Sequence, residues 1–129
     1  MEQTVLIIED DESISKALEV RLQSRGFRVT IAFDAIMGMQ KAAELLPQAI
    51  LLDITLPGGN GLSLAERLKN SDRTQKIPII FLTASKQADL RRSAIAVGGA
   101  ALFEKPYDFE YLLAALRAVI QHPTVRLAI

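Results

Sequence analysis

Four short apolar runs along the chain each end in polar residues with distinctive chemistry. The runs cover residues 5–8, 49–52, 78–82 and 100–104, and the polar residues that follow them are Glu9 with Asp10, Asp53, Thr83 and Lys105. If the runs are parallel strands of one sheet, their carboxyl ends lie along the same edge. Ligands of open α/β sheets bind at that edge. The pattern therefore predicts one small site containing carboxylates, a hydroxyl and an ammonium.

Strand patterns alternate with helical patterns five times. The expected strands cover residues 4–8, 27–32, 49–52, 78–82 and 100–103, and the expected helices cover 14–22, 36–46, 62–70, 86–97 and 108–121. This alternation predicts an α/β domain with a parallel sheet covered by helices on both faces. The buried faces of the first two helices are predicted from helical spacing. They are expected to contain Ile14, Leu18, Val20 and Leu22 in the first helix and Met39, Ala43 and Leu46 in the second.

Composition narrows the class of protein further. The chain has 129 residues, half of them hydrophobic, which suits one ordinary domain with a full core. Fifteen basic residues balance fifteen acidic ones, so no charge excess draws the chain to nucleic acid or to a membrane surface. There is no cysteine, which excludes disulfides and thiolate zinc sites. The start lacks a signal-peptide pattern, and no run approaches the ~20 apolar residues that cross a bilayer, so a soluble cytoplasmic protein is expected.

The carboxylates at the ends of the first and third strands predict a metal site. If Asp10 and Asp53 end neighbouring strands, they lie roughly 5 Å apart. At that separation two carboxylates repel by about 3 kcal/mol at an effective dielectric near ~20. A divalent cation turns the repulsion into coordination, and Mg²⁺ accepts carboxylates, carbonyls and water. The alternative is that the acids after residue 8 only cap a helix and complement its dipole, and that Asp53 leads into a turn.

Thr83 and Lys105 extend this site to two further strand ends. The simpler interpretations are strand propensity followed by a helix cap for Thr83, and a solvated lysine before a turn proline for Lys105. In the functional interpretation the hydroxyl donates to a phosphoryl oxygen and the ammonium neutralises an anion. A metal, a donor, a cation and a positioned attacking oxygen are what phosphoryl transfer requires. A carboxylate nucleophile such as Asp53 would form an aspartyl phosphate.

Four motifs in order, VLIIEDDE, ILLDITLPGGNGL, PIIFLTAS and FEKPY, resemble the receiver domain of two-component response regulators. The resemblance covers roughly residues 4–120. It implies that Asp53 is the phosphoacceptor, Thr83 the switch hydroxyl and Lys105 the phosphate-binding lysine. It also implies a Mg²⁺ or Mn²⁺ site whose ligands are Asp10, Asp53, the backbone carbonyl of Thr55 and, through water, Glu9.

The resemblance also implies a fold and a domain boundary. The expected fold is flavodoxin-like, (βα)5: a doubly wound five-stranded parallel sheet of order 2-1-3-4-5. The Lys105–Pro106 peptide bond is expected to be cis. The receiver domain would cover residues 1–121, and residues 122–129 would be a C-terminal tail or the start of a linker.

The implied partners are a histidine kinase or phosphotransfer protein and a downstream output domain or output protein. Phosphorylation would change partner affinity at the face formed by the fourth helix, the fifth strand and the fifth helix. A phosphorylation-dependent homodimer is also compatible with the resemblance, whereas direct nucleic acid or membrane binding is not expected. The chain would phosphorylate itself from a donor and slowly dephosphorylate itself, without acting as an enzyme on other substrates.

Two positions depart from the family pattern. Glu9 stands where the family often has aspartate, so shifted metal coordination is expected. Leu102 stands where the family commonly has a rotating tyrosine or phenylalanine, and the neighbouring Phe103 is expected to face the opposite side of the sheet. Thr55 and Ser85, two residues past Asp53 and Thr83, are small, so water can approach and the phosphoprotein should not be exceptionally long-lived.

Three alternatives remain open from the sequence. An unphosphorylated receiver-like interaction domain is compatible with Leu102. A phosphatase of the haloacid dehalogenase type also uses an aspartate nucleophile and Mg²⁺, but it normally has a second aspartate where this chain has Thr55. A flavodoxin-type FMN module needs a loop rich in hydroxyls and glycine after the first strand, where the acidic residues of this chain would repel phosphate.

Overall fold

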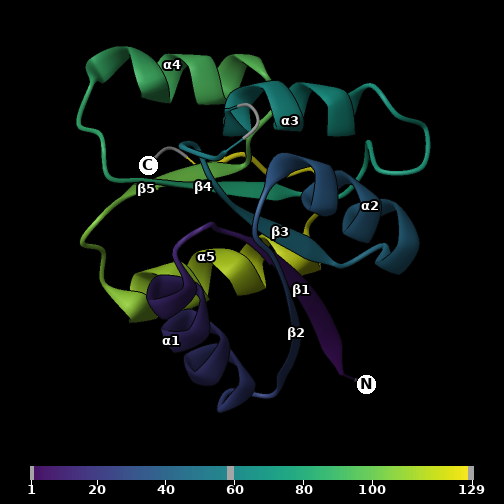
Figure 1. The fold of residues 1–129 in the computed structure, drawn as a ribbon, viewed down its shortest axis with the longest axis vertical. Coiled ribbons are helices and arrows are strands. Elements are labelled where there is room, and N and C mark those ends of the chain that lie inside the picture. The colour runs from purple at the N-terminus through teal and green to yellow at the C-terminus, as the bar shows by residue number, and fades with distance from the viewer. Residues whose placement is uncertain (1, 58–59, 128–129) are drawn as a thin grey trace.

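The computed structural model of the chain describes residues 2–57 and 60–127. Five strands alternate with five helices, as Figure 1 shows. The strands are β1 (Gln3–Ile8), β2 (Phe27–Ala32), β3 (Ala49–Asp53), β4 (Ile79–Thr83) and β5 (Ala101–Glu104). The helices are α1 (Glu12–Gln23), α2 (Ala35–Leu45), α3 (Gly61–Lys69), α4 (Ala88–Ala96) and α5 (Phe109–Gln121). Within the described ranges, no helix combines the length and the apolar character needed to span a bilayer.

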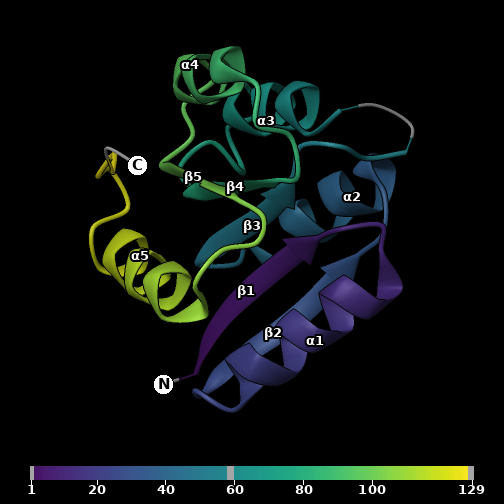
Figure 2. The same cartoon turned by 90° about the vertical axis from the view of Figure 1, so that its left-hand side faces the viewer.

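The strands form one parallel sheet in the order β2-β1-β3-β4-β5. Helices α1 and α5 cover one face, and α2, α3 and α4 cover the other (Figures 1 and 2). Strand order reverses between β1 and β3, so their carboxyl ends adjoin, and Ile8 pairs with Leu52. The doubly wound fold expected from the sequence is confirmed, and this reversal is where such folds bind ligands.

The core consists of two hydrophobic clusters, one on each face of the sheet. Residues alternate between them along each strand: Val5 and Ile7 belong to the cluster under α1 and α5, and Leu6 and Ile8 belong to the cluster under α2, α3 and α4. The central strands are apolar on both faces because each face is covered by helices. The rigid core therefore fixes the strand ends that carry the polar residues.

The buried face of α1 differs from the prediction at two positions. Leu18 and Leu22 are buried as expected, and Ser15 joins them, but 41% of Ile14 and 58% of Val20 are exposed. Residues two apart on a helix point to nearly opposite sides, so Val20 cannot share a face with both leucines. The prediction placed Val20 on the buried face because the residue is hydrophobic, and that placement is wrong.

The predicted buried face of α2 is confirmed only in part: Met39 and Ala43 are half-buried, and Met39 packs against the core. The buried residues are Ala35, Gly38 and Ala42, whereas Leu46 is 44% exposed and caps the helix with a left-handed φ of 46°. The helix approaches the sheet closely, since a methyl group on Gly38 would lie 2.8 Å from the side chain of Ile8. Small residues therefore form the contact face, which an apolar-periodicity argument does not detect.

Candidate functional site

Glu9 and Asp10 follow the last residue of β1. The amide of Glu9 donates to the carbonyl of Ala32 over 3.0 Å, which holds Glu9 in line with the sheet. Its side chain is buried, whereas Asp10 is exposed. Asp11, the next residue, caps α1 by accepting the amide of Ile14 at 2.9 Å. The capping interpretation is therefore confirmed for Asp11. Capping does not account for Glu9 and Asp10, which precede it.

Asp53 is the last residue of β3 and is 7% exposed. It pairs with Leu82 of β4, and the following amide of Ile54 donates to the carbonyl of Leu82 over 3.0 Å. One carboxylate oxygen, Oδ1, accepts the amide of Thr55 at 2.9 Å. The sheet and the turn together hold the carboxylate of Asp53 at the carboxyl edge.

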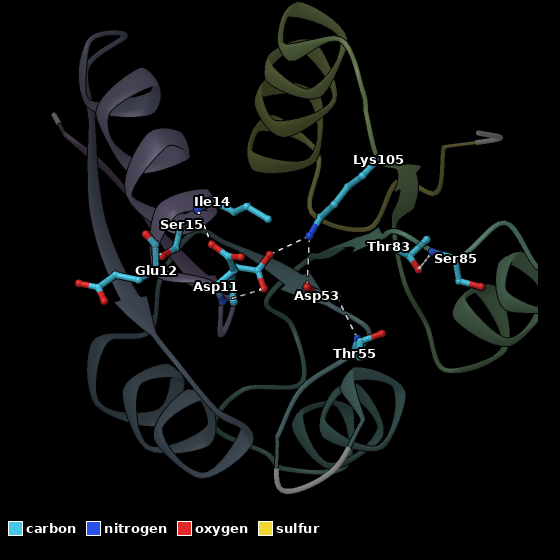
Figure 3. Close-up of polar contacts among 10 residues, drawn as sticks. Asp11, Glu12, Ile14, Ser15, Asp53, Thr55, Thr83, Ser85 and Lys105 are labelled. Atoms are coloured by element: carbon cyan, nitrogen blue, oxygen red, sulfur yellow. Dashed lines mark hydrogen bonds and ion pairs between the residues drawn. The ribbon is translucent and has the colours of Figure 1, made fainter.

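Lys105 reaches across the strand ends from the segment after β5 (Figure 3). Its Nζ donates to Oε1 of Glu9 over 2.7 Å and to Oδ2 of Asp53 over 3.2 Å. Burial alone would lower the pKa of Lys105, but the contacts with the two carboxylates outweigh it and hold that pKa above the ordinary value. The Lys105–Pro106 bond is cis, as the resemblance implied. The ammonium of Lys105 therefore places a fixed positive charge against the carboxylates of Glu9 and Asp53.

Glu9, Asp10 and Asp53 converge at this edge. Each offers a carboxylate oxygen, and these oxygens lie within 4.8 Å of one another. Burial and the hydrogen bond to Asp53 raise the pKa of Glu9 to about 7, against the opposing effect of Lys105. The single ammonium of Lys105 therefore does not fully offset the repulsion among these three carboxylates. A donor set of carboxylates around one point is what Mg²⁺ or Mn²⁺ prefers, so the residues fit a divalent cation.

Thr83 ends β4 at the same edge, and its residue is 1% exposed. Its hydroxyl oxygen accepts the amide of Ser85 at 3.0 Å. Figure 3 shows Thr83 and Ser85 beside each other and apart from Asp53. Among the described residues, the side-chain hydroxyl of Thr83 is hydrogen-bonded only within its own loop, whereas Lys105 is linked to Thr83 through the backbone, where its amide donates to the Thr83 carbonyl over 2.7 Å. A switch role for Thr83 therefore requires this loop to move, and it remains a prediction.

Gly61, the first residue of α3, is a positioning residue that sequence reasoning missed. Its amide donates to the carbonyl of Ile54 over 2.6 Å. A methyl group at this position would collide with the backbone carbonyl of Asp53 and would lie 2.8 Å from Cα of Ile54. In the sequence, the pair Asn60-Gly61 indicates only a turn or loop and does not reveal this close approach. The start of α3 can approach the end of β3 this closely because Gly61 has no side chain.

Position 102, where the receiver family commonly has an aromatic residue, lies in β5. Leu102 is 4% exposed and belongs to the cluster under α2, α3 and α4, whereas Phe103 packs against the opposite cluster. The expected opposite orientation of Phe103 is confirmed. Its ring makes an edge contact with Tyr107 at 6.1 Å between centroids. No aromatic side chain therefore stands at position 102, and the leucine there is held in the core.

Comparison with known proteins agrees with this geometry. The family model of the response regulator receiver domain matches residues 5–117. A relative from Synechocystis, the DNA-binding dual master transcriptional regulator RpaA, is 36% identical over 117 residues, which are 91% of this chain and 48% of that protein. The chain spans about half the length of the curated relatives it matches.

Solved structures show the same fold at high similarity. The chemotaxis response regulator CheY4 of Vibrio cholerae has a TM-score of 0.85 and 26% identity, with 92% of this chain and 99% of that chain covered. The receiver domain of the sensor histidine kinase PA1611 from Pseudomonas aeruginosa has a TM-score of 0.85 and 30% identity, with 94% and 99% covered. That structure holds a magnesium ion coordinated in its active site cleft. The fold, the acidic pocket and the matched family together show that this chain belongs to the response regulator receiver domain family.

Proposed function

We propose that Asp53 accepts a phosphoryl group from a histidine kinase or a phosphotransfer protein, and that the chain thereby acts as a phosphorylation-controlled switch. The observation that supports this most directly is the convergence of three carboxylates with one ammonium. Carboxylate oxygens of Glu9, Asp10 and Asp53 lie within 4.8 Å of one another, and Lys105 contacts two of these residues. The phosphatase alternative still lacks its second aspartate, since Thr55 occupies that position.

A divalent cation, Mg²⁺ or Mn²⁺, belongs to this proposal. Glu9, Asp10, Asp53 and the backbone carbonyl of Thr55 would hold it, with Glu9 acting mainly through water. The magnesium in the cleft of the PA1611 receiver domain supports this assignment. When bound, the cation supplies positive charge against the oxygens of the transferring phosphoryl group.

Asp53 provides the nucleophile in the proposed reaction. One carboxylate oxygen attacks phosphorus, the bond from phosphorus to the donor nitrogen breaks, and the histidine of the donor keeps the electron pair. Lys105 is already positioned to neutralise charge at Asp53. Its cationic form is favoured by the raised pKa. Electrostatic stabilisation of this kind is the main contribution that proteins make to phosphoryl transfer.

The phosphorylated state would bias two regions toward a second arrangement. A phosphoryl group adds about −1.5 to −2 charge and three acceptor oxygens. The Thr83 hydroxyl would exchange its contact with Ser85 for one of these oxygens, and the loop after β4 would follow. Partner affinity at α4, β5 and α5 would then shift between two populations. The downstream partner would be an output domain or output protein, in a cytoplasmic setting.

Incubation with acetyl phosphate and Mg²⁺, followed by intact mass measurement, tests the proposal. The wild-type chain should gain the mass of one phosphoryl group, and Asp53→Asn should gain none. Excess EDTA should abolish the gain. Asp11→Asn is the matched control, because Asp11 caps α1 outside the carboxylate cluster and asparagine caps equally well.

Two results would reject the assignment: an unmodified wild-type chain, or undiminished modification of Asp53→Asn.

A second measurement addresses the lifetime of the phosphorylated protein. Thr55 is exposed and Ser85 is half-buried, so water is not excluded by these small side chains. The modified protein should lose its phosphoryl group at neutral pH well within a day, and persistence over days would contradict the proposed self-dephosphorylation.

A further inference from the structure

A pocket of ≈ 200 Å³ lies between α4, β5 and the segment that follows α5. Most of the residues that border it are apolar, among them Ala94, Leu102 and Leu127. The amide of Leu127 donates to the carbonyl of Ala100 over 2.7 Å, which fixes the segment after α5 as one wall. Figure 2 shows this segment running from α5 toward β5 and α4. The volume is below the ~300–1,000 Å³ of typical ligand pockets, so the pocket suits a small molecule.

Arg91 of α4 borders the pocket and has an incomplete set of partners. Its Nη2 lies 3.9 Å from Oε1 of Glu104, and both side chains are about half exposed. That distance is too long for a hydrogen bond. Its Nη1 is buried and has no hydrogen-bond partner within residues 2–57 and 60–127. Because buried polar groups are nearly always hydrogen-bonded, Nη1 requires an acceptor that these residues do not supply.

Arg126 brings a second positive charge to the border of the pocket. Its Nη1 donates to the carbonyls of Thr124 and Val125 at 3.3 and 3.0 Å, which holds the guanidinium against its own segment. Burial and, after it, the charge of Arg126 lower the pKa of Lys69, so this end of the pocket is electropositive. No acidic residue of the described part of the chain borders the pocket.

An apolar wall beside two arginines is complementary to a molecule that has an anionic end and an apolar body. A carboxylate matches the planar guanidinium and accepts charge-assisted hydrogen bonds from it. A neutral apolar molecule would leave Nη1 of Arg91 without an acceptor, and a cation would be repelled. We propose that this pocket binds a small aliphatic carboxylate, with the carboxylate on Arg91 and the tail between α4 and β5.

Titration of the isotope-labelled full-length chain with octanoate, followed by two-dimensional amide NMR spectra, tests the proposal. Octanoate should shift the amide signals of residues 94–102 and of Leu127 in a saturable manner. Octanol, which keeps the tail, should bind about tenfold more weakly, as expected when a hydrogen bond to a charged group is lost. Acetate, which keeps the carboxylate, should also bind more weakly. Absence of saturable shifts would overturn the proposal, with water left as the partner of Nη1, and equal binding of octanol would overturn the role of the carboxylate.

Two arginine variants separate the pocket from a general charge effect. Arg91→Gln should weaken octanoate binding by about tenfold, because it removes the charged donor. Arg92→Gln is the matched control, since Arg92 is exposed on the same helix and does not border the pocket. It removes the same charge and should bind octanoate as the wild-type chain does. Equal weakening in both variants would overturn the assignment to Arg91.

A second pair of variants keeps the test independent of the stability of Arg91→Gln. Ile95 borders the pocket and is 63% exposed, so substitutions there should fold, and the amide spectra report this directly. Ile95→Asp should bind octanoate more weakly than Ile95→Lys, because the two variants lose the same apolar contact and differ in charge. An equal or reversed order would overturn the electrostatic part of the proposal. None of these measurements involves phosphoryl transfer, so their outcome is independent of the proposed function.

Discussion

The ammonium group of Lys105 lies 2.7 Å from Oε1 of Glu9, although the two residues are 96 positions apart in the chain. The same ammonium contacts Asp53 at 3.2 Å. Both carboxylates are buried, so neither is well screened by water. Lys105 therefore acts as an internal counter-ion in the metal-free chain, and this contact supports a direct test.

Lys105→Met should destabilise the metal-free chain, because three acids then crowd one edge without a cation. The expected loss is about 2 kcal/mol in the free energy of unfolding, below the roughly 3–5 kcal/mol for breaking a fully buried pair. Mg²⁺ should raise the melting temperature of the variant more than that of wild type. Thermal unfolding with and without Mg²⁺ measures both effects.

Lys16→Met is the control for Lys105→Met. The side chain of Lys16 is 71% exposed and pairs with Glu19 at 3.4 Å, and exposed pairs contribute only about 0–1 kcal/mol. It should leave both the stability and the Mg²⁺ response near wild type. Equal stabilisation of wild type and Lys105→Met by Mg²⁺ would show that the ammonium does not balance these acids.

Gly61→Ala should disturb the position of Asp53 without touching its side chain. The added methyl group would collide with the backbone at Asp53 and Ile54. Such overpacking typically costs ~1–3 kcal/mol, and the displaced strand end should slow phosphorylation by acetyl phosphate. Ser63→Ala, at an exposed position in the same helix, is the control. A variant that folds and is phosphorylated at the wild-type rate would contradict the positioning role.

Leu102→Ala should weaken the fold while leaving the phosphorylation chemistry in place. Leu102 is 4% exposed, and truncation of a buried leucine costs ~2–5 kcal/mol. Ile95→Ala on α4 is the control, since Ile95 is 63% exposed and surface substitutions stay within about 0.5 kcal/mol. Urea denaturation measures the difference. If both variants unfold alike, position 102 is not a core position and an exposed, mobile side chain must be considered there.

Lys69 should make stability depend on pH in the alkaline range. Its Nζ donates to the carbonyls of Ile77 and Gln75 at 2.9 and 3.3 Å. Burial, with a smaller effect of Arg126, lowers the pKa of Lys69 from 10.5 to about 8. Between these values the unfolded chain binds the proton more strongly, so the contribution of Lys69 to the free energy of unfolding rises as pH increases. Below pH 8 the cost of the buried charge is present in full.

The measurement for Lys69 is the difference in unfolding free energy between wild type and Lys69→Met, followed from pH 7 to 11. The difference should shift in favour of wild type between pH 8 and 10.5. Arg126→Gln should narrow that window because it removes the second cause of the shift. A difference that stays constant with pH would contradict the lowered pKa.

Local patterns in the sequence were sufficient for the order of elements and for part of the site. Four apolar runs, together with a strand pattern at residues 27–32, predicted the five strands, and the residue types after the runs predicted that Asp53 and Lys105 share one edge, which the structure shows. These inferences succeeded because strand and helix periodicities are short-range properties. The strand order came from the resemblance, since periodicity does not specify which strands adjoin.

Tertiary packing decided the remaining features. The exposure of Val20, the close approach that requires Gly61 and the contact of Thr83 with its own loop depend on where elements pack. The same holds for the docking of Leu127 beside β5. The burial and the partners of a side chain depend on residues tens of positions away in the chain. Local sequence spacing contains no information about which of those residues come close in space. The sequence by itself determined which groups reach the sheet edge, and packing alone determined what each of them touches there.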